Sequence, residues 1–170
     1  MVHGLHHAPT LACVSHHDVL LRRSFLIAHE ARVAGNHPFG ALLAVDGVVV
    51  AEAQNQVNTG HDITAHAETV LVRMLEQAGD IGLLSGGTVF ASCEPCPMCV
   101  GSMFWAGARH VVYGLSSARL MELSTPPGGD PMGFIITAAQ IGGDATPPMV
   151  FDGPRYEDEA AAAHVGFWFA

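Results

Sequence analysis

Two short stretches decide the fold and the chemistry of this chain: residues 92–99 read SCEPCPMC, and residues 61–68 read HDITAHAE. Cys96 and Cys99 are three positions apart, so a helical turn at this point carries both sulfurs on one face. Two thiolates and the imidazole of His66 suit zinc, a borderline-soft ion that favours tetrahedral nitrogen and sulfur sites. Only three good protein ligands are evident, which is the pattern of a catalytic zinc with an open fourth position.

Glu68 follows His66 by two residues, and side chains at i and i+2 of a regular helix point in different directions. At a helix N-terminus, however, His66 can reach the metal while Glu68 faces the water bound to it. Zinc lowers the pKa of such a water to about 7, and the neighbouring carboxylate acts as a general acid/base. The predicted reaction is metal-assisted hydrolysis. The alternative, a structural zinc site, needs a fourth ligand and leaves Glu68 without a purpose.

Hydrophobic periodicity around these motifs predicts helices that alternate with strands. Helices are expected over residues 18–34, 65–78, 96–106 and 155–165, and strands over residues 39–45, 48–53, 88–92 and 110–115. Asp46-Gly47 predicts a hairpin turn, and Asp18 is the expected cap of the first helix. This alternation is typical of an α/β sheet covered on both faces. The last third is turn-rich, with one apolar run at residues 134–136.

The composition limits the classes of protein to which the chain can belong. It has 170 residues, 49% of them hydrophobic, and a formal net charge of −9. We expect one domain over residues 1–170, with a flexible leader at 1–17 and a C-terminal helix or tail at 155–170. No stretch approaches the roughly 20 apolar residues of a membrane span. Seven arginines and no lysine make nucleic-acid binding an unlikely partner interaction.

The N-terminal residues have no basic group before the first apolar stretch, so they do not form a secretory signal, and we expect a cytoplasmic protein. In that compartment clustered cysteines indicate metal binding or catalysis. Cys93 is expected in the core, and Cys13 as an incidental thiol. The leader also holds histidines, for which a mobile tail is favoured over a metal-binding tract: His3, His6, His7, His16 and His17.

The order H-x-E and then P-C-x-x-C resembles the signature of the zinc-dependent cytidine deaminase superfamily. His37-Pro38-Phe39-Gly40-Ala41 and Asn55 precede it, and together these motifs are similar to the bacterial guanine deaminase and tRNA adenosine deaminase branch. The resemblance covers roughly residues 25–115. It implies a three-layer α/β/α fold with a central mixed five-stranded sheet, usually assembled as a homodimer.

The resemblance also implies roles for individual residues. His66, Cys96 and Cys99 would bind one zinc ion per chain. Glu68 would activate the water, protonate a ring nitrogen and then protonate the departing amine. The candidates for substrate binding are Asn55 by its side chain, Ala67 and Ser92 by their backbone, and Phe39 and Trp168. For Asn55, a turn residue at the end of a hairpin is the alternative interpretation.

Aromatic residues outside the motifs have two competing interpretations. Phe104 and Trp105 are expected in the core or at a dimer interface rather than against substrate. Phe167-Trp168-Phe169 lies near the end of the sequence, where aromatic side chains are ordered only if they dock. Our hypothesis is that this tail closes over a bound base, in its own subunit or its neighbour; surface packing is the alternative.

Several amines remain possible as the leaving group. A small nucleobase or nucleoside is expected, with a guanine-type purine favoured and a cytosine- or cytidine-type amine, or an aminated pterin or triazine, as the alternative. A tRNA adenosine is less favoured because the chain has no lysine for phosphate contacts. Residues 116–123 depart from the acidic pattern of guanine deaminases, and Glu122 is the candidate to substitute for it. A non-enzymatic zinc module is the least favoured reading.

Overall fold

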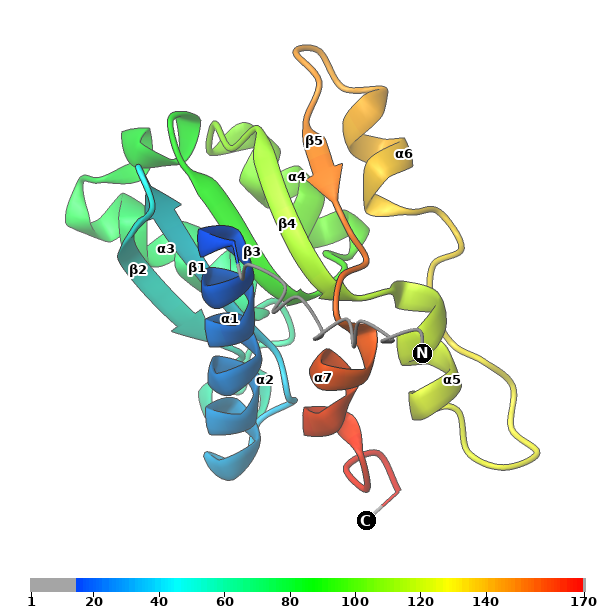
Figure 1. Ribbon diagram of the computed structural model, residues 1–170. Coiled ribbons are helices and arrows are strands. Elements are labelled where there is room, and N and C mark those ends of the chain that lie inside the picture. Colours follow the sequence, from blue (N-terminus) through cyan, green and yellow to red (C-terminus); the bar gives the residue numbers. More distant parts are fainter. Residues whose placement is uncertain (1–14, 170) are drawn as a thin grey trace, which may run out of the picture.

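A computed structural model describes residues 15–169, whose centre is a mixed five-stranded sheet (Figure 1). The strand order is β2-β1-β3-β4-β5. β1 runs antiparallel to both β2 and β3, whereas β3, β4 and β5 are parallel. The strands are β1 (Gly40–Val45), β2 (Val48–Gln54), β3 (Thr88–Cys93), β4 (His110–Leu115) and β5 (Val150–Asp152).

Helices cover both faces of the sheet, so the protein has three layers (Figure 1). Alternate residues of β1 show this directly: Leu42 packs in a core beneath α1 (His16–Val33) and α7 (Glu157–Ala161), whereas Leu43 packs in a core beneath α3 (Ala67–Ala78) and α4 (Pro97–Trp105). The central strands are therefore apolar throughout rather than alternating. The expected three-layer α/β/α architecture is confirmed. The other elements are α2 (Val57–Gly60), η1 (Ile81–Ser85), α5 (Ser117–Ser124), α6 (Ala138–Gly143) and η2 (Ala162–His164).

Of the local predictions, the hairpin turn is confirmed and the start of the first helix is corrected. Asp46 and Gly47 both have positive φ, at 49° and 78°, as a two-residue hairpin requires. The first helix begins earlier than expected, because Ser15 and Asp18 form a capping box in which each side chain accepts the other's backbone N–H. The predicted cap at Asp18 is wrong, and His16 and His17 belong to α1 rather than to a leader. His3, His6, His7 and Cys13 lie outside the described residues.

The last third differs more from expectation. The fifth strand, β5, lies at Val150–Asp152, where no strand was predicted, and the apolar run at residues 134–136 belongs to a loop. The predicted helix at 155–165 is shorter: α7 ends at Ala161 and a 3₁₀ turn follows. Trp105 is 85% exposed, so of its two expected positions, the core or a dimer interface, only the interface remains, whereas Phe104 packs partly against the core and Cys93 is buried as predicted.

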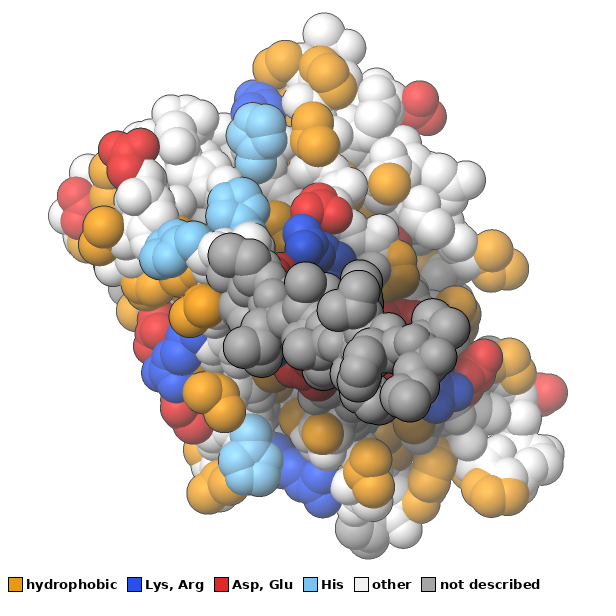
Figure 2. Space-filling view, in the orientation of Figure 1, with side chains coloured by type: hydrophobic (Ala, Val, Ile, Leu, Met, Phe, Trp, Pro, Cys, Tyr) orange, Lys and Arg blue, Asp and Glu red, His pale blue; other side chains and the backbone are white. Residues whose placement is uncertain are grey.

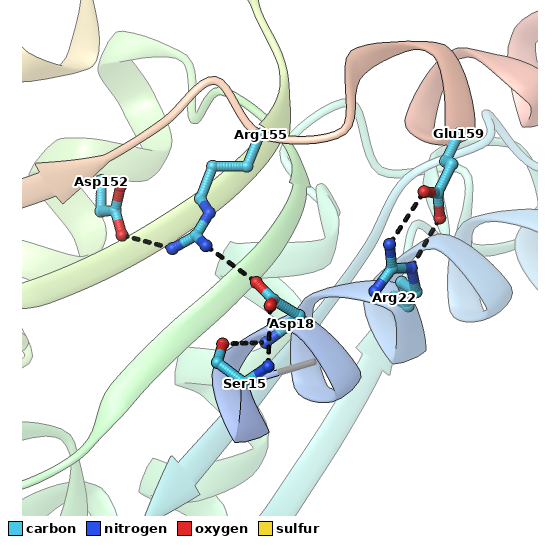
Figure 3. Close-up of polar contacts among 6 residues, drawn as sticks. All are labelled: Ser15, Asp18, Arg22, Asp152, Arg155 and Glu159. Carbon is cyan, nitrogen blue, oxygen red and sulfur yellow. Dashed lines mark hydrogen bonds and ion pairs between the residues drawn. The ribbon is translucent and has the colours of Figure 1, made fainter. Parts of the chain in front are cut away.

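Ion pairs hold the C-terminal segment against α1 (Figure 3). Arg155 bridges Asp152 and Asp18, at 2.9 and 2.8 Å, and Arg22 binds both carboxylate oxygens of Glu159. The contacts to Asp18 and to Glu159 each join residues 137 positions apart in the sequence. Among the described residues, no helix combines the length and the apolar character needed to cross a membrane.

Candidate active site

His66, Cys96 and Cys99 meet where two helices begin. His66 is the N-cap of α3 and Cys96 is the N-cap of α4, both with extended backbone, and Cys99 lies in the first turn of α4. α3 packs against α4, which brings the two N-termini together. β3 leads directly into this region, so the cluster lies beyond the carboxyl end of a parallel strand, the usual position for a site in such sheets.

The separations among the three side chains fit a tetrahedral zinc ion. His66 Nδ1 lies 3.7 Å from Cys96 Sγ and 3.6 Å from Cys99 Sγ, and the two sulfurs lie 3.5 Å apart. A tetrahedral ion at about 2.3 Å from sulfur and about 2.0 Å from nitrogen requires about 3.8 Å between sulfurs and about 3.5 Å between nitrogen and sulfur. The three residues therefore form a candidate zinc site that needs little rearrangement.

The charges of the cluster also favour a cation. The hydrogen bond between the sulfurs lowers the pKa of Cys96 to about 4 and raises the pKa of Cys99, because a second thiolate would repel the first. The hydrogen bond with Cys96 raises the pKa of His66. A divalent cation among the three ligands removes the repulsion and allows both thiols to ionise.

Glu68 lies in the first turn of α3 with its carboxylate in the same cluster. Its side chain is 7% exposed, and its Oε2 lies 3.4 Å from Cys99 Sγ. Burial raises the pKa of Glu68. A carboxyl group with a raised pKa accepts a proton and releases it again at neutral pH more readily than an exposed one. The position beside the ligands, rather than among them, is the one expected from the sequence.

A cavity of about 170 Å³ opens onto these residues. Phe39 forms one wall, and side chains from α5 and from the loop at residues 131–136, which we call the rim loop, form the apolar side. The apolar residues of this second side are Leu120, Met121, Met132, Phe134 and Ile136. The cavity therefore combines one polar end, at the candidate zinc site, with apolar walls that exclude water.

Of the predicted substrate residues, Phe39 lines this cavity, whereas Asn55, Ala67 and Ser92 are not among the lining residues. Asn55 is fully buried; its Oδ1 accepts the Val57 N–H, as a turn residue would, but its Nδ2 has no partner among the described residues. The Ser92 hydroxyl accepts the Gly40 N–H, and Ala67 is buried at the start of α3. Asn55 thus forms a turn and still has a free donor.

Trp168 lies outside the residues that line the cavity. Its ring packs against His37, Phe39 and His164, with centroid distances of 5.7, 6.2 and 5.9 Å. Apart from Phe39, the large apolar side chains that line the cavity come instead from α5 and the rim loop. The C-terminal aromatic residues therefore dock on the protein. Of the rings of His37, Phe39 and His164, only that of Phe39 lines the cavity.

Glu94 lines the cavity and was not among the site residues predicted from the sequence. Its buried carboxylate accepts the Ser117 N–H and the Ala138 N–H, each at 2.9 Å. It thereby fixes the start of α5 and of α6 beside the cavity. The sequence held a signal for it: Glu94 lies inside the SCEPCPMC motif, just after the strand predicted over residues 88–92. A carboxylate buried at such a position needs hydrogen-bond partners. Glu122, which was expected near the base, instead pairs with Arg119 on the surface.

Comparison with known proteins gives consistent results. The family model for the cytidine and deoxycytidylate deaminase zinc-binding region matches residues 14–115. The chain is 38% identical over 149 residues to a probable cytosine deaminase of Schizosaccharomyces pombe, covering 87% of this chain and 90% of that protein. It is 40% identical over 107 residues to guanine deaminase of Bacillus subtilis, covering 62% and 69%. A solved tRNA:A34 deaminase structure superposes with a TM-score of 0.65 at 27% identity, covering 85% of this chain and 98% of that chain.

Proposed function

This chain belongs to the cytidine and deoxycytidylate deaminase zinc-binding family, and from that premise we propose that its substrate is a free nucleobase whose exocyclic amine is hydrolysed to ammonia. The observation that carries the choice of a free base is the cavity volume of about 170 Å³. Pockets for drug-sized ligands measure about 300–1,000 Å³, so this cavity suits one small heterocycle better than a nucleoside.

The catalytic work is assigned to the cluster at the start of α3 and α4. His66, Cys96 and Cys99 would hold zinc, which when bound supplies a Lewis acid that lowers the pKa of a water. Glu68 takes a proton from the attacking water and delivers it to a ring nitrogen. It then takes the second proton, from the hydroxyl group now on the ring carbon, and passes it to the departing amine. A C–O bond forms, the C–N bond breaks and ammonia leaves. The buried position of Glu68 supports this role, because its carboxyl keeps a raised pKa there.

Substrate orientation is assigned to Asn55, Ala67 and Ser92, which are buried and do not line the cavity, so a base can reach them only if binding opens the cavity toward them. The free Nδ2 of Asn55 supports a hydrogen bond to an acceptor of the base, and the backbone at Ala67 and Ser92 is proposed to meet its polar edge. Leaving a buried amide donor without a partner costs about 1–3 kcal/mol, which a bound acceptor would recover. Phe39 provides an apolar surface for the ring.

A guanine-type purine is the first candidate, because the motifs of this chain resemble those of guanine deaminases. Cytosine is the second, and one observation favours it: the match to the probable cytosine deaminase is long enough to include the whole segment that forms α5 and the rim loop. A tRNA substrate is disfavoured because the chain has no lysine. On the face shown in Figure 2, arginines stand apart from one another among acidic side chains rather than in one basic patch.

A homodimer is proposed for the assembly. The indole of Trp105 at the end of α4 is 85% exposed, and large apolar side chains at such positions are typical of interfaces. Sedimentation equilibrium of the wild type and of Trp105→Ser tests this, since the variant should shift the mass toward the monomer. A wild-type protein that sediments as a monomer at micromolar concentration contradicts the proposal.

An ammonia-release screen tests the substrate assignment. The compounds are guanine, guanosine, adenine, cytosine, cytidine, and aminated pterins and triazines. We expect release from a free base and little from the corresponding nucleoside, with Glu68→Gln as the control for contaminating activity. Equal kcat/KM for a base and its nucleoside would refute the argument from cavity size.

A further inference from the structure

Phe39, which lines the cavity, also packs against the C-terminal turn, by which we mean η2 and the residues that follow it. The His164 ring meets the Phe39 ring edge-on at 5.2 Å, and the Trp168 ring stacks on His164 at an interplanar angle of 11°. His164 is only 2% exposed. A close-packed ring leaves its neighbour little freedom, so the position of Phe39 depends on the size of the side chain at 164.

This turn is anchored at several points to α1. Arg32 donates to the carbonyls of Ala163 and Val165, at 2.9 and 2.7 Å, on either side of His164. Arg22, also in α1, pairs with Glu159 of α7, the helix that precedes this turn, as Figure 3 shows. The backbone of the turn is thus fixed to a long helix, and a change of side-chain volume at 164 is passed to Phe39 rather than absorbed by movement of the tail.

Hydrogen bonding within the described chain does not explain an imidazole at this position. Neither ring nitrogen of His164 has a partner among residues 15–169, and burial lowers the pKa of His164 to about 4, so the ring is neutral. In the described structure the neutral imidazole acts as a flat ring that fills the space between Trp168 and Phe39.

We propose that His164 is a positioning residue that sets the width of the base-binding cavity through Phe39, and thereby selects the size of the heterocycle. This inference rests on the proposed function. A smaller side chain at 164 lets the Phe39 ring retreat from the cavity, and a larger ring pushes it inward. Phe39 is the point of contact, since it lines the cavity and also touches both His164 and Trp168.

The test is a volume series at position 164: His164→Ala, the wild type and His164→Phe. For each protein kcat/KM is measured for cytosine against 5-methylcytosine and for guanine against 8-methylguanine, using whichever pair the wild type deaminates. One methylene in an apolar pocket changes kcat/KM about 10–200-fold. We therefore expect the ratio for the methylated over the parent base to rise about tenfold in His164→Ala and to fall by a similar factor in His164→Phe, mainly through KM.

Two further variants keep the test decisive if His164→Ala folds poorly. Arg22→Ala releases the anchor to Glu159 without touching the cavity, and it should raise the same ratio by a smaller factor. Arg23→Ala removes the comparable pairs of α1 with Glu30 and Glu52 and should leave the ratio unchanged.

A merely structural role for His164 would reduce kcat/KM for both bases by the same factor, so a constant ratio across the folded variants overturns the proposal. A wild type that releases ammonia from none of the bases would instead refute the proposed function.

Discussion

The buried imidazole of His164 predicts a specific pH dependence of stability. In the folded protein burial lowers its pKa from 6.5 to about 4, whereas the unfolded chain keeps the ordinary value. The unfolded state therefore binds a proton more readily, and the free energy of unfolding falls as the pH falls from 6.5 toward 4. Above pH 6.5 the imidazole is neutral in both states and contributes no pH dependence.

The magnitude follows from the difference of about 2.5 pKa units, at about 1.4 kcal/mol per unit. The full loss is about 3 kcal/mol below pH 4, and between pH 7 and pH 5 the expected loss is about 2 kcal/mol. His164→Phe keeps a buried ring but cannot bind a proton, so it lacks this component. At pH 7 the gain from removing an unpaired buried polar ring, about 1 kcal/mol or more, is opposed by the strain of the larger ring, so the test rests on the change with pH.

Urea unfolding of both proteins at pH 5, 6 and 7 measures the effect. Metal ligands and surface carboxylates titrate in both proteins, and the difference between wild type and His164→Phe cancels their contributions because the sites are distinct. We expect the variant's advantage to grow by about 2 kcal/mol from pH 7 to pH 5. An advantage that is constant with pH would show that His164 is not buried in neutral form, and the packing argument would fail with it.

Three further predictions concern the site itself. Glu68→Gln, which keeps the shape of the side chain, should lower kcat about 10²–10⁴-fold while the zinc content stays near one per chain; ammonia release at the wild-type rate would contradict the assigned role. Cys96→Ser should lose zinc in metal analysis of the purified protein, and a variant that keeps a full complement would show that the ion is held elsewhere. Glu94→Gln places an amide where two backbone N–H groups need acceptors, so we expect a loss of about 1.5–3 kcal/mol in urea unfolding and a raised KM as α5 shifts; an unchanged KM would separate Glu94 from the cavity.

Local chemistry explains why much of the fold could be predicted. The hairpin at Asp46-Gly47 needs positive φ at both residues, which few other pairs tolerate. The helices over α3 and α4 begin at the motif residues and end within one or two residues of the predicted bounds. The expectation of zinc likewise depended on ligand types and spacing, which a sequence displays directly.

The C-terminal third could not be predicted in the same way. β5 has three residues, and only its pairing with β4 makes it a strand. α5 and α6 start where the Glu94 carboxylate accepts their N–H groups, an interaction across more than twenty residues that no local pattern reveals. Trp168 was recognised as a side chain that must dock, but its partners, His37 and His164, were not predictable.

The sequence by itself determined which residues are the candidate zinc ligands, which carboxylate is the candidate acid/base group, and the three-layer architecture, because these depend on residue type and on spacings within one turn or one strand. Only the tertiary structure decided what surrounds the heterocycle. Phe39, Met121 and Met132 line one cavity because β1, α5 and the rim loop converge on the end of β3. His164 reaches Phe39 because α1 binds the C-terminal turn. Such contacts join residues distant in the chain, and their energy comes from packing that no single segment contains.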